Sequence, residues 1–175
     1  MNNPKPPSNG DTDFDVNAAI KLACKTSFGV LDSNFLCQSL GILDFKNPIF
    51  VKPQDKLIKA VSALKENKIG AVLVVDEQDK LCGIFSERDC ILKVLGNSID
   101  FNQALVSEYM TSSPTSATPD VTIAYALNLM SLGGFRHLPI VTEDNTTIAV
   151  VSIKDIVDHL VESFTSDLMQ FEIKS

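Results

Sequence analysis

The chain has 175 residues, of which 45% are hydrophobic, a length that fits one compact domain or two small domains with a shared core. Its net charge of −7 argues against a nucleic-acid partner, because binding to phosphate backbones needs a basic surface. No stretch approaches the roughly 20 apolar residues of a membrane span, and residues 1–15 lack the apolar core of a secretory signal. We therefore expect a cytoplasmic protein.

Four cysteines are scattered without Cys-x-x-Cys spacing, at Cys24, Cys37, Cys82 and Cys90. A disulfide framework is unusual at this size, so we expect reduced thiols that pack as small hydrophobic side chains. The chain also lacks a nucleophile elbow, a Walker lysine loop and a His-Glu-x-x-His zinc motif. We expect no enzymatic activity, no metal site and no catalytic cofactor.

Residues 1–45 predict an N-terminal extension. Its first 13 residues are rich in Pro, Asn, Asp and Gly and are expected to be disordered. A helix capped by Asp15 follows, since apolar residues recur there at helical spacing. A second short helix is expected over Asn34–Leu40, and the whole extension shows no counterpart later in the sequence.

From Asn47 the pattern predicts a strand, a helix, two strands and a helix. Ile49–Val51 has the character of a short strand, Leu57–Leu64 of an amphipathic helix and Ala71–Val75 of a buried strand. A polar turn then predicts a hairpin with the strand Leu81–Phe85. A final helix begins after Ser86, and its inner face is expected to carry the apolar side chains Ile91, Leu92 and Leu95.

The same pattern returns 66 residues later without insertion or deletion. Matched pairs include Pro48 and Pro114, Leu57 and Ile123, Leu64 and Met130, Ser86 and Ser152, and Asp89 and Asp155. This register predicts a duplicated β-α-β-β-α unit. One unit buries too little surface to be stable alone, so two copies should pack their sheets about a pseudo-twofold axis. Two related clefts would then lie where strands end and helices begin.

Each copy contains a similar motif at the end of its last strand. Gly83 to Asp89 has the form Gly-x-x-Ser-x-x-Asp, and Ala149 to Asp155 repeats it with alanine in the glycine position. With these motifs, and with a second strand over Phe135–Val141, the chain resembles a tandem pair of CBS domains (a Bateman module). The resemblance implies an α/β (α+β) fold with CBS repeats at 46–105 and 106–165 and a C-terminal tail at 166–175.

CBS pairs commonly bind AMP, ADP, ATP or S-adenosylmethionine in their two clefts. The resemblance therefore implies a regulatory module that binds an adenosine-containing ligand, forms a homodimer and signals to a partner protein. The family's signature aspartate accepts hydrogen bonds from the ribose hydroxyls, a role that falls to Asp89 and Asp155 here. Ser86 and Ser152 match the hydroxyl residue that helps to hold ribose or phosphate.

The resemblance also implies which residues surround each aspartate. The cleft of Asp89 would contain Ser86, Phe85, Arg88, Ser113, Pro114, Thr115, Phe135, Arg136 and His137. The cleft of Asp155 would contain Ser152, Val151, Lys154, Asn47, Pro48, Ile49, Ile69 and Gly70. Because Arg136 and His137 correspond to Gly70 and Ala71, the Asp89 cleft is expected to suit phosphates better and to hold a phosphorylated ligand first.

The two Ser-x-x-Asp motifs are also capping boxes, in which the hydroxyl and the carboxylate bond to backbone amides at a helix N-terminus. This interpretation needs no ligand, and it leaves a dimerisation or protein-interaction module as the alternative function. Two helix faces would suit a dimer interface or a core equally well, and they carry Ile91, Leu92 and Leu95, and Ile156, Val157 and Leu160.

Overall fold

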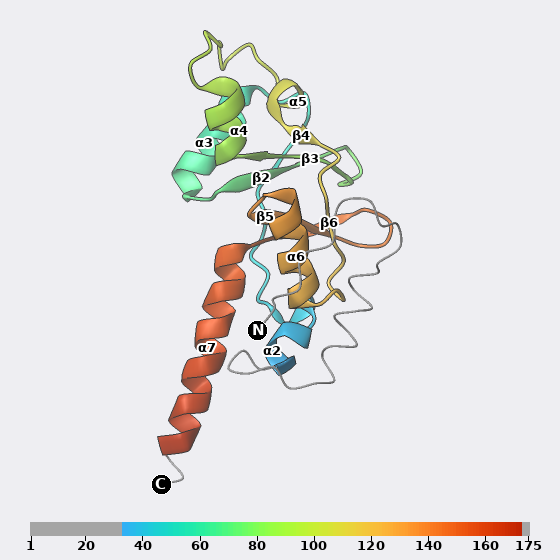
Figure 1. Cartoon of the computed structure of the whole chain (residues 1–175). Coiled ribbons are helices and arrows are strands. Elements are labelled where there is room, and N and C mark those ends of the chain that lie inside the picture. Colours follow the sequence, from blue (N-terminus) through green and yellow to red (C-terminus); the bar gives the residue numbers. More distant parts are fainter. Residues whose placement is uncertain (1–32, 173–175) are drawn as a thin grey trace, which may run out of the picture.

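The computed structural model describes residues 33–172, and side chains from 34 to 163, so the helix expected from Asp15 lies outside the described residues. Figure 1 shows the arrangement. The first repeat comprises β1 (Phe50–Val51), α3 (Leu57–Asn67), β2 (Ala71–Val75), β3 (Leu81–Ser86), α4 (Glu87–Asp89) and the π-helical turn η2 (Cys90–Val94). The connection to the second repeat holds α5 (Val106–Tyr109) and β4 (Thr111–Ser112). The second repeat comprises α6 (Ile123–Gly133), β5 (His137–Val141), β6 (Thr147–Ser152) and α7 (Ile153–Glu172).

The strands of both repeats follow the predicted order. In the first repeat, β1 pairs parallel to β2, β2 forms a hairpin with β3, and β4 adds to the far edge of β3. In the second, β5 and β6 form the hairpin, and a single parallel bridge between Ala117 and Ile140 stands in place of the first strand. That bridge lies 66 residues after the pair of Val51 and Val74, so the register of the duplication is kept.

Each repeat has its own hydrophobic core beneath one amphipathic helix. Leu57, Ala60 and Leu64 of α3 are buried against the first sheet, and the matching face of α6 is buried against β5 and β6. β2 is buried at every position because its second face packs toward the other repeat, where Val150 contacts the cluster of Ala71, Leu73 and Ile84. This two-sided burial explains the continuous apolar run in its sequence.

The segment that precedes each repeat packs on the other repeat. Leu40, in the 3-10 turn η1 (Leu40–Ile42) that follows α2 (Ser33–Cys37), donates its backbone N–H to Val121 at 2.8 Å. Val106 donates to Asp55 at 2.9 Å, with both residues shifted by 66. Two further pairs of backbone bonds keep this offset, Gly41 to Pro119 with Ser107 to Pro53, and Ile123 to Gln38 with Leu57 to Ala104.

Residues 38–43 therefore complete the second repeat as residues 104–109 complete the first. Leu40 and Val106 are both fully buried at equivalent positions. This corrects the expectation that the extension has no counterpart. The expected helix over Asn34–Leu40 is divided into α2 and η1, and Ser39 caps η1 through a hydrogen bond from the N–H of Gly41.

The final helix of the first repeat differs from the prediction. Ile91, Leu92 and Leu95 are 62%, 72% and 73% exposed, so they do not form its inner face. The π-helical turn places one additional residue in the turn, with the N–H of Leu95 bonded to the carbonyl of Cys90. As a result Val94 faces the core in place of its neighbour.

The equivalent helix α7 is regular and has 20 residues. Ile156 is buried, Leu160 packs against the core and Val157 is exposed. Neither this helix nor any other in the described part of the chain is long and apolar enough to cross a membrane.

The cysteines only partly follow expectation. Cys82 and Cys90 are free thiols, and burial raises the pKa of each. Cys37 is disulfide-bonded, so the expectation of a reduced thiol is wrong for this residue. Cys24 lies outside the described residues.

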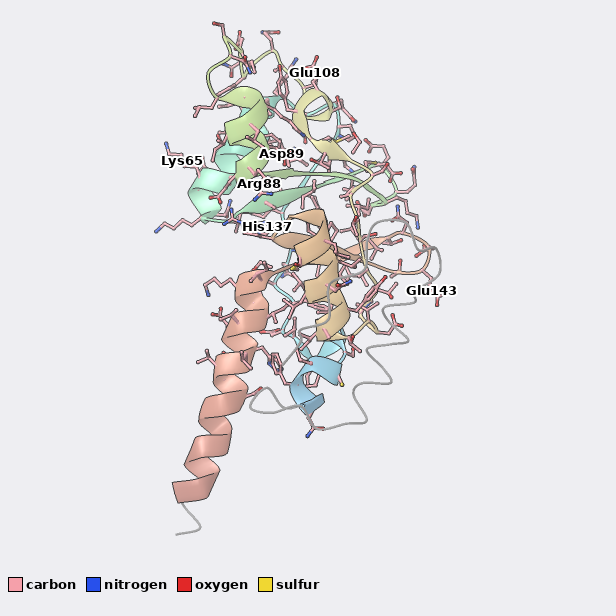
Figure 2. The ribbon with its side chains drawn as sticks, in the orientation of Figure 1. Lys65, Arg88, Asp89, Glu108, His137 and Glu143 are labelled. Atoms are coloured by element: carbon pink, nitrogen blue, oxygen red, sulfur yellow. The ribbon has the colours of Figure 1, made fainter. Side chains whose placement is uncertain are left out.

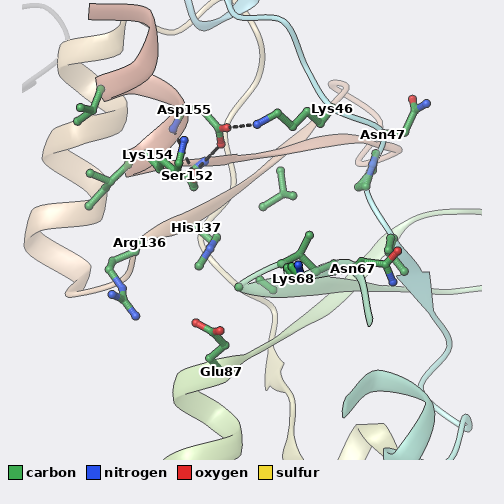
Figure 3. A pocket seen from close by; sticks show the side chains of 18 residues that line it. Lys46, Asn47, Asn67, Lys68, Glu87, Arg136, His137, Ser152, Lys154 and Asp155 are labelled. Carbon is green, nitrogen blue, oxygen red and sulfur yellow. Dashed lines mark hydrogen bonds and ion pairs between the residues drawn. The ribbon is translucent and has the colours of Figure 1, made fainter. Parts of the chain in front are cut away.

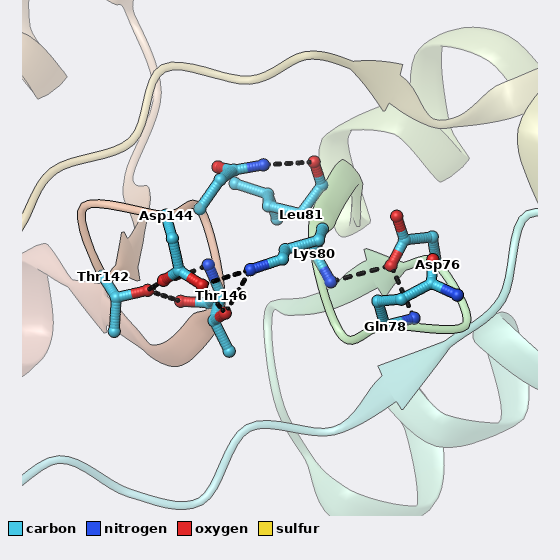
Figure 4. A network of polar contacts seen from close by, with 8 residues as sticks. Asp76, Gln78, Lys80, Leu81, Thr142, Asp144 and Thr146 are labelled. Atoms are coloured by element: carbon cyan, nitrogen blue, oxygen red, sulfur yellow. Dashed lines mark hydrogen bonds and ion pairs between the residues drawn. The ribbon is translucent and has the colours of Figure 1, made fainter.

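The two hairpin tips are joined to each other, as Figure 4 shows. Lys80 of the first tip contacts the carboxylate of Asp144 and lies 2.7 Å from Oγ1 of Thr146 in the second. Two backbone hydrogen bonds cross between the tips, Leu81 to Asn145 and Thr147 to Asp79. The two repeats are therefore fastened at the ends of their hairpins, and the starts of β2 and β5 lie at the opposite ends of these strands.

Candidate functional site

A cavity of about 820 Å³ lies between the repeats, where β2 and β5 begin and α7 starts (Figure 3). Ten of the residues implied by the resemblance line it, namely Asn47, Pro48, Ile49, Ile69, Gly70, Arg136, His137, Ser152, Lys154 and Asp155. Eight further residues were not predicted, namely Lys46, Asn67, Lys68, Ala71, Glu87, Val150, Ile153 and Val157. The cavity therefore draws its walls from both repeats and from the segment that leads into β1.

The other residues implied by the resemblance do not line this cavity, and they are Asp89, Ser86, Phe85, Arg88, Ser113, Pro114, Thr115, Phe135 and Val151. Phe85 and Val151 are buried in the two hydrophobic cores. Arg88 donates a hydrogen bond to the carbonyl of Gly134. In Figure 2, Arg88 and Asp89 lie at α4, and His137 lies at the start of β5.

The placement of Arg136 and His137 corrects the expected pairing. The resemblance implied that both residues belong to the cleft of Asp89, whereas both line the cavity that contains Asp155. They precede and begin β5, whose partner strand β6 ends at Ser152, so the hairpin brings them beside the N-terminus of α7. The cationic groups expected near Asp89 are thus near Asp155.

Asp155 is held at the N-terminus of α7 with one oxygen facing outward. Its Oδ2 accepts hydrogen bonds from the backbone N–H of Ser152 at 2.8 Å and from the Ser152 hydroxyl at 2.6 Å. Its own N–H donates to the same hydroxyl at 3.2 Å, which completes the predicted capping box. Burial tends to raise the pKa of Asp155, but these hydrogen bonds and the nearby Lys46 hold it below its usual value.

Lys46 contacts the second oxygen of Asp155. Its Nζ lies 3.0 Å from Oδ1, and its side chain is 77% exposed. The ion pair raises the pKa of Lys46. Since exposed ion pairs contribute only about 0–1 kcal/mol, an incoming ligand can displace Lys46 from the carboxylate at little cost.

The cavity has a surplus of positive charge although the chain is acidic. Lys46, Lys68, Arg136 and Lys154 line it, against the two carboxylates Glu87 and Asp155. The N-terminus of α7 adds the positive end of a helix dipole beside Asp155. An anionic group would therefore be attracted into the cavity.

His137 forms the floor between the two repeats. It packs so closely on Gly70 that a Cβ at this glycine would lie 2.5 Å from the imidazole Nε2. Burial lowers the pKa of His137 and the positive charge of Arg136 lowers it further, which outweighs the opposite effect of Glu87 and Asp155. The ring is therefore neutral at pH 7.

Asp89 has the same capping box but a different environment. Its Oδ2 accepts from the N–H and the hydroxyl of Ser86, at 2.9 and 2.6 Å. Its Oδ1 lies 2.6 Å from Nζ of Lys93 and accepts a hydrogen bond from the hydroxyl of Thr111 at 2.9 Å. Burial tends to raise the pKa of Asp89, but these contacts hold it below its usual value.

Metal-ligand chemistry finds no support in residues 33–172, where no group of three His, Cys, Asp or Glu side chains is placed to hold an ion.

Comparison with known proteins identifies the family. The CBS domain model matches residues 43–96 and 106–162. An uncharacterized 17.7 kDa protein of Acidianus ambivalens is 35% identical over 69% of this chain and 70% of its own length. A CBS-domain-containing protein from Agrobacterium tumefaciens superimposes with a TM-score of 0.59, at 32% identity over 65% of this chain and 90% of its own. CBSX2 of Arabidopsis thaliana, solved in complex with AMP, superimposes with a TM-score of 0.63, at 23% identity over 71% and 97% of the two chains.

The chain belongs to the CBS-domain family and contains two CBS domains in tandem. The α+β fold of two β-α-β-β-α repeats that the sequence predicts is confirmed. The family assignment also confirms that the protein is regulatory rather than an enzyme, because its matched relatives are CBS-domain proteins.

Proposed function

We propose that this protein senses an adenosine-containing ligand, which binds in the cavity beside Asp155 and changes how the protein acts on a partner protein. The observation that carries the proposal is the partly exposed carboxylate of Asp155 at the edge of a cavity with an apolar wall. A carboxylate can accept hydrogen bonds from two vicinal ribose hydroxyls at once. The apolar wall, with Pro48, Ile49, Ile69 and Val150, would take the adenine ring.

The charges favour a phosphorylated ligand such as AMP over S-adenosylmethionine. A phosphate would meet Lys46, Arg136, Lys154 and the N-terminus of α7. The sulfonium of S-adenosylmethionine would bring a further positive charge among these groups. The complex of CBSX2 with AMP supports the same ligand class.

Calorimetric titration with AMP, ADP, ATP and S-adenosylmethionine tests the proposal, together with thermal unfolding. Ligand at 100 times its dissociation constant stabilises the protein by about 2.7 kcal/mol, which raises the unfolding midpoint by roughly 5–10 °C at this chain length. Asp155→Asn should remove the effect. A folded protein that gives neither heat nor a shift with any of these compounds would contradict the proposal.

A ligand-free interaction module is the second candidate, and one observation favours an interface in either case. Ile91, Leu92 and Leu95 are exposed on η2 and just after it, and Val157 and Val161 are exposed on the equivalent helix α7. Since both repeats present apolar side chains at equivalent positions, we propose that they meet the same faces of a second copy in a homodimer. In the ligand-free alternative, this interface would be the whole function and the Ser-x-x-Asp motifs would only cap helices.

A further inference from the structure

The two signature aspartates differ in how many of their oxygen positions are free. A carboxylate offers about four acceptor positions. All the contacts of Asp89 come from within the fold, two on each oxygen, from Ser86, Lys93 and Thr111. At Asp155 the fold supplies two contacts to Oδ2, and Oδ1 meets only the exposed Lys46. The side chains are accordingly 9% and 27% exposed.

Two differences in sequence between equivalent positions cause this asymmetry. Lys93 corresponds to His159, and Thr111 corresponds to Phe45. His159 lies against Phe35, with ring centroids 5.6 Å apart, and bonds to Gln38 at 3.0 Å. Phe45 has no hydroxyl group to offer. The second repeat therefore lacks both groups that occupy Oδ1 in the first.

Lys93 is itself held in place by further contacts. Its Nζ donates to the carbonyl oxygens of Tyr109 and Met110, at 2.9 and 3.1 Å, in addition to its ion pair with Asp89. Thr111 belongs to β4, which pairs with β3. A ribose approaching Asp89 would have to break this whole set of contacts, and the exposed Lys46 is the only comparable obstacle printed on Oδ1 of Asp155.

We propose that each chain takes one ligand, at Asp155, and that Asp89 has become a structural residue. The cluster of Ser86, Asp89, Lys93 and Thr111, here called the Asp89 cluster, joins the start of α4 to β4 and closes the equivalent site. The single-ligand assignment depends on the proposed function, whereas the structural role of Asp89 does not. The inference replaces the expectation that the Asp89 cleft is occupied first.

Titration of the full chain with AMP tests the binding half. We expect one equivalent per chain, no binding by Asp155→Asn, and binding within about twofold of wild type by Thr111→Val, because that hydroxyl lies outside the cavity. Two equivalents per chain, or one retained by Asp155→Asn at wild-type affinity, would overturn the assignment. If the wild type takes up no AMP, both the single-ligand assignment and the proposed function fail for this ligand, and the structural half is still decided as follows.

Thermal unfolding without ligand tests the structural half. Lys93→Met and Thr111→Val should each lower the midpoint by about 2–6 °C, because each leaves the buried carboxylate with one contact fewer. Lys46→Met, the matched variant at the exposed pair, should change the midpoint by about 2 °C or less. Equal shifts in all three variants would show that the Asp89 cluster has no special structural role.

A transfer of the lysine tests the cause. His159→Lys puts the first repeat's residue one turn after Asp155, where it can occupy Oδ1, and should weaken AMP binding at least about tenfold. His159→Gln is the control, because it also loses the stacking on Phe35 but brings no cation, and should bind as wild type. Unchanged affinity in a folded His159→Lys variant would contradict the assigned cause.

Discussion

Lys46 and Asp155 meet at the edge of the cavity although 109 residues separate them. A neutral nucleoside would have to break this ion pair to reach Asp155 and would leave Lys46 without a counter-charge. A nucleotide would break the same pair, but its phosphate could take the place of the carboxylate beside Lys46. The pair therefore favours nucleotides over nucleosides.

Lys46→Met should reduce this preference. We expect AMP affinity to fall about two- to fivefold, the range of one exposed ion pair, while adenosine affinity stays the same or rises. Isothermal calorimetry with both ligands gives the ratio. Lys59→Met is the control, because Lys59 pairs with Asp55 and does not line the cavity. An unchanged ratio of AMP to adenosine affinity in the Lys46 variant would show that this lysine does not sense phosphate.

His137 should make stability depend on pH. Burial and Arg136 lower its pKa, so the unfolded chain takes up the proton more readily than the folded one. The resulting stability is present above about pH 6.5, the ordinary pKa of histidine, and is lost as the pH falls below it. We expect the unfolding midpoint to fall between about pH 7 and pH 5.5, and His137→Gln to reduce this fall. Calorimetry of the ligand-free protein decides, and identical pH profiles would contradict the prediction.

Which site residues could be predicted depends on how they are encoded. Asp155 and Ser152 belong to a repeated local motif, so the sequence alone indicates them. Lys46 stands in a polar segment without periodicity, and only the folded chain brings it to Asp155. The difference between Lys93 and His159 was visible in the alignment of the repeats, but its meaning depends on the contact that Lys93 makes with Asp89.

At the scale of elements, the segment around η1 is a structural part of the second repeat. Leu40 is fully buried in the same core as Ile123 and Met130 of α6. Sequence periodicity finds helices and strands by their own apolar faces, but η1 has only three residues and shows no period. The same limit applies to β4, which has two exposed residues, and to the π-helical turn that moved Leu95 out of the core.

Leu40→Ala should therefore destabilise the protein like a substitution in a central core. We expect a loss of about 2–5 kcal/mol in the free energy of unfolding, from lost burial and a new cavity. Ile42→Ala, in the same turn but 52% exposed, should cost about 0.5 kcal/mol or less. Urea denaturation of both variants gives the comparison. A loss at Leu40 no larger than that at Ile42 would show that the segment is not part of the core.

At the scale of the whole molecule, the sheets of the two repeats pack together and the hairpin tips are joined by Lys80 and Asp144. The duplication predicted this arrangement, because neither repeat can bury both faces of its sheet alone. The joined tips were not predictable, since Lys80 and Asp144 do not match by the 66-residue offset. Apolar side chains remain exposed on the outside, on η2 and α7.

The homodimer proposal places these side chains at the interface. Leu92→Glu should convert a dimer to a monomer, because a buried carboxylate without a partner opposes association. Ile42→Glu is the control at another exposed apolar position. Light scattering after size-exclusion chromatography measures the mass. A wild-type monomer, or a Leu92→Glu variant that remains dimeric, would contradict this interface.

The crossed packing of the segments before each repeat also sets an order of events during synthesis. The ribosome makes the chain from its N-terminus, so residues 104–109 emerge directly after the repeat that they complete. Residues 38–43 emerge early, but their binding place at Pro119, Val121 and Ile123 is made some 80 residues later. Leu40 and its apolar neighbours must stay without their core until then. An early part of this chain is thus among the last to reach its place, and during that interval the nascent chain is most exposed to aggregation.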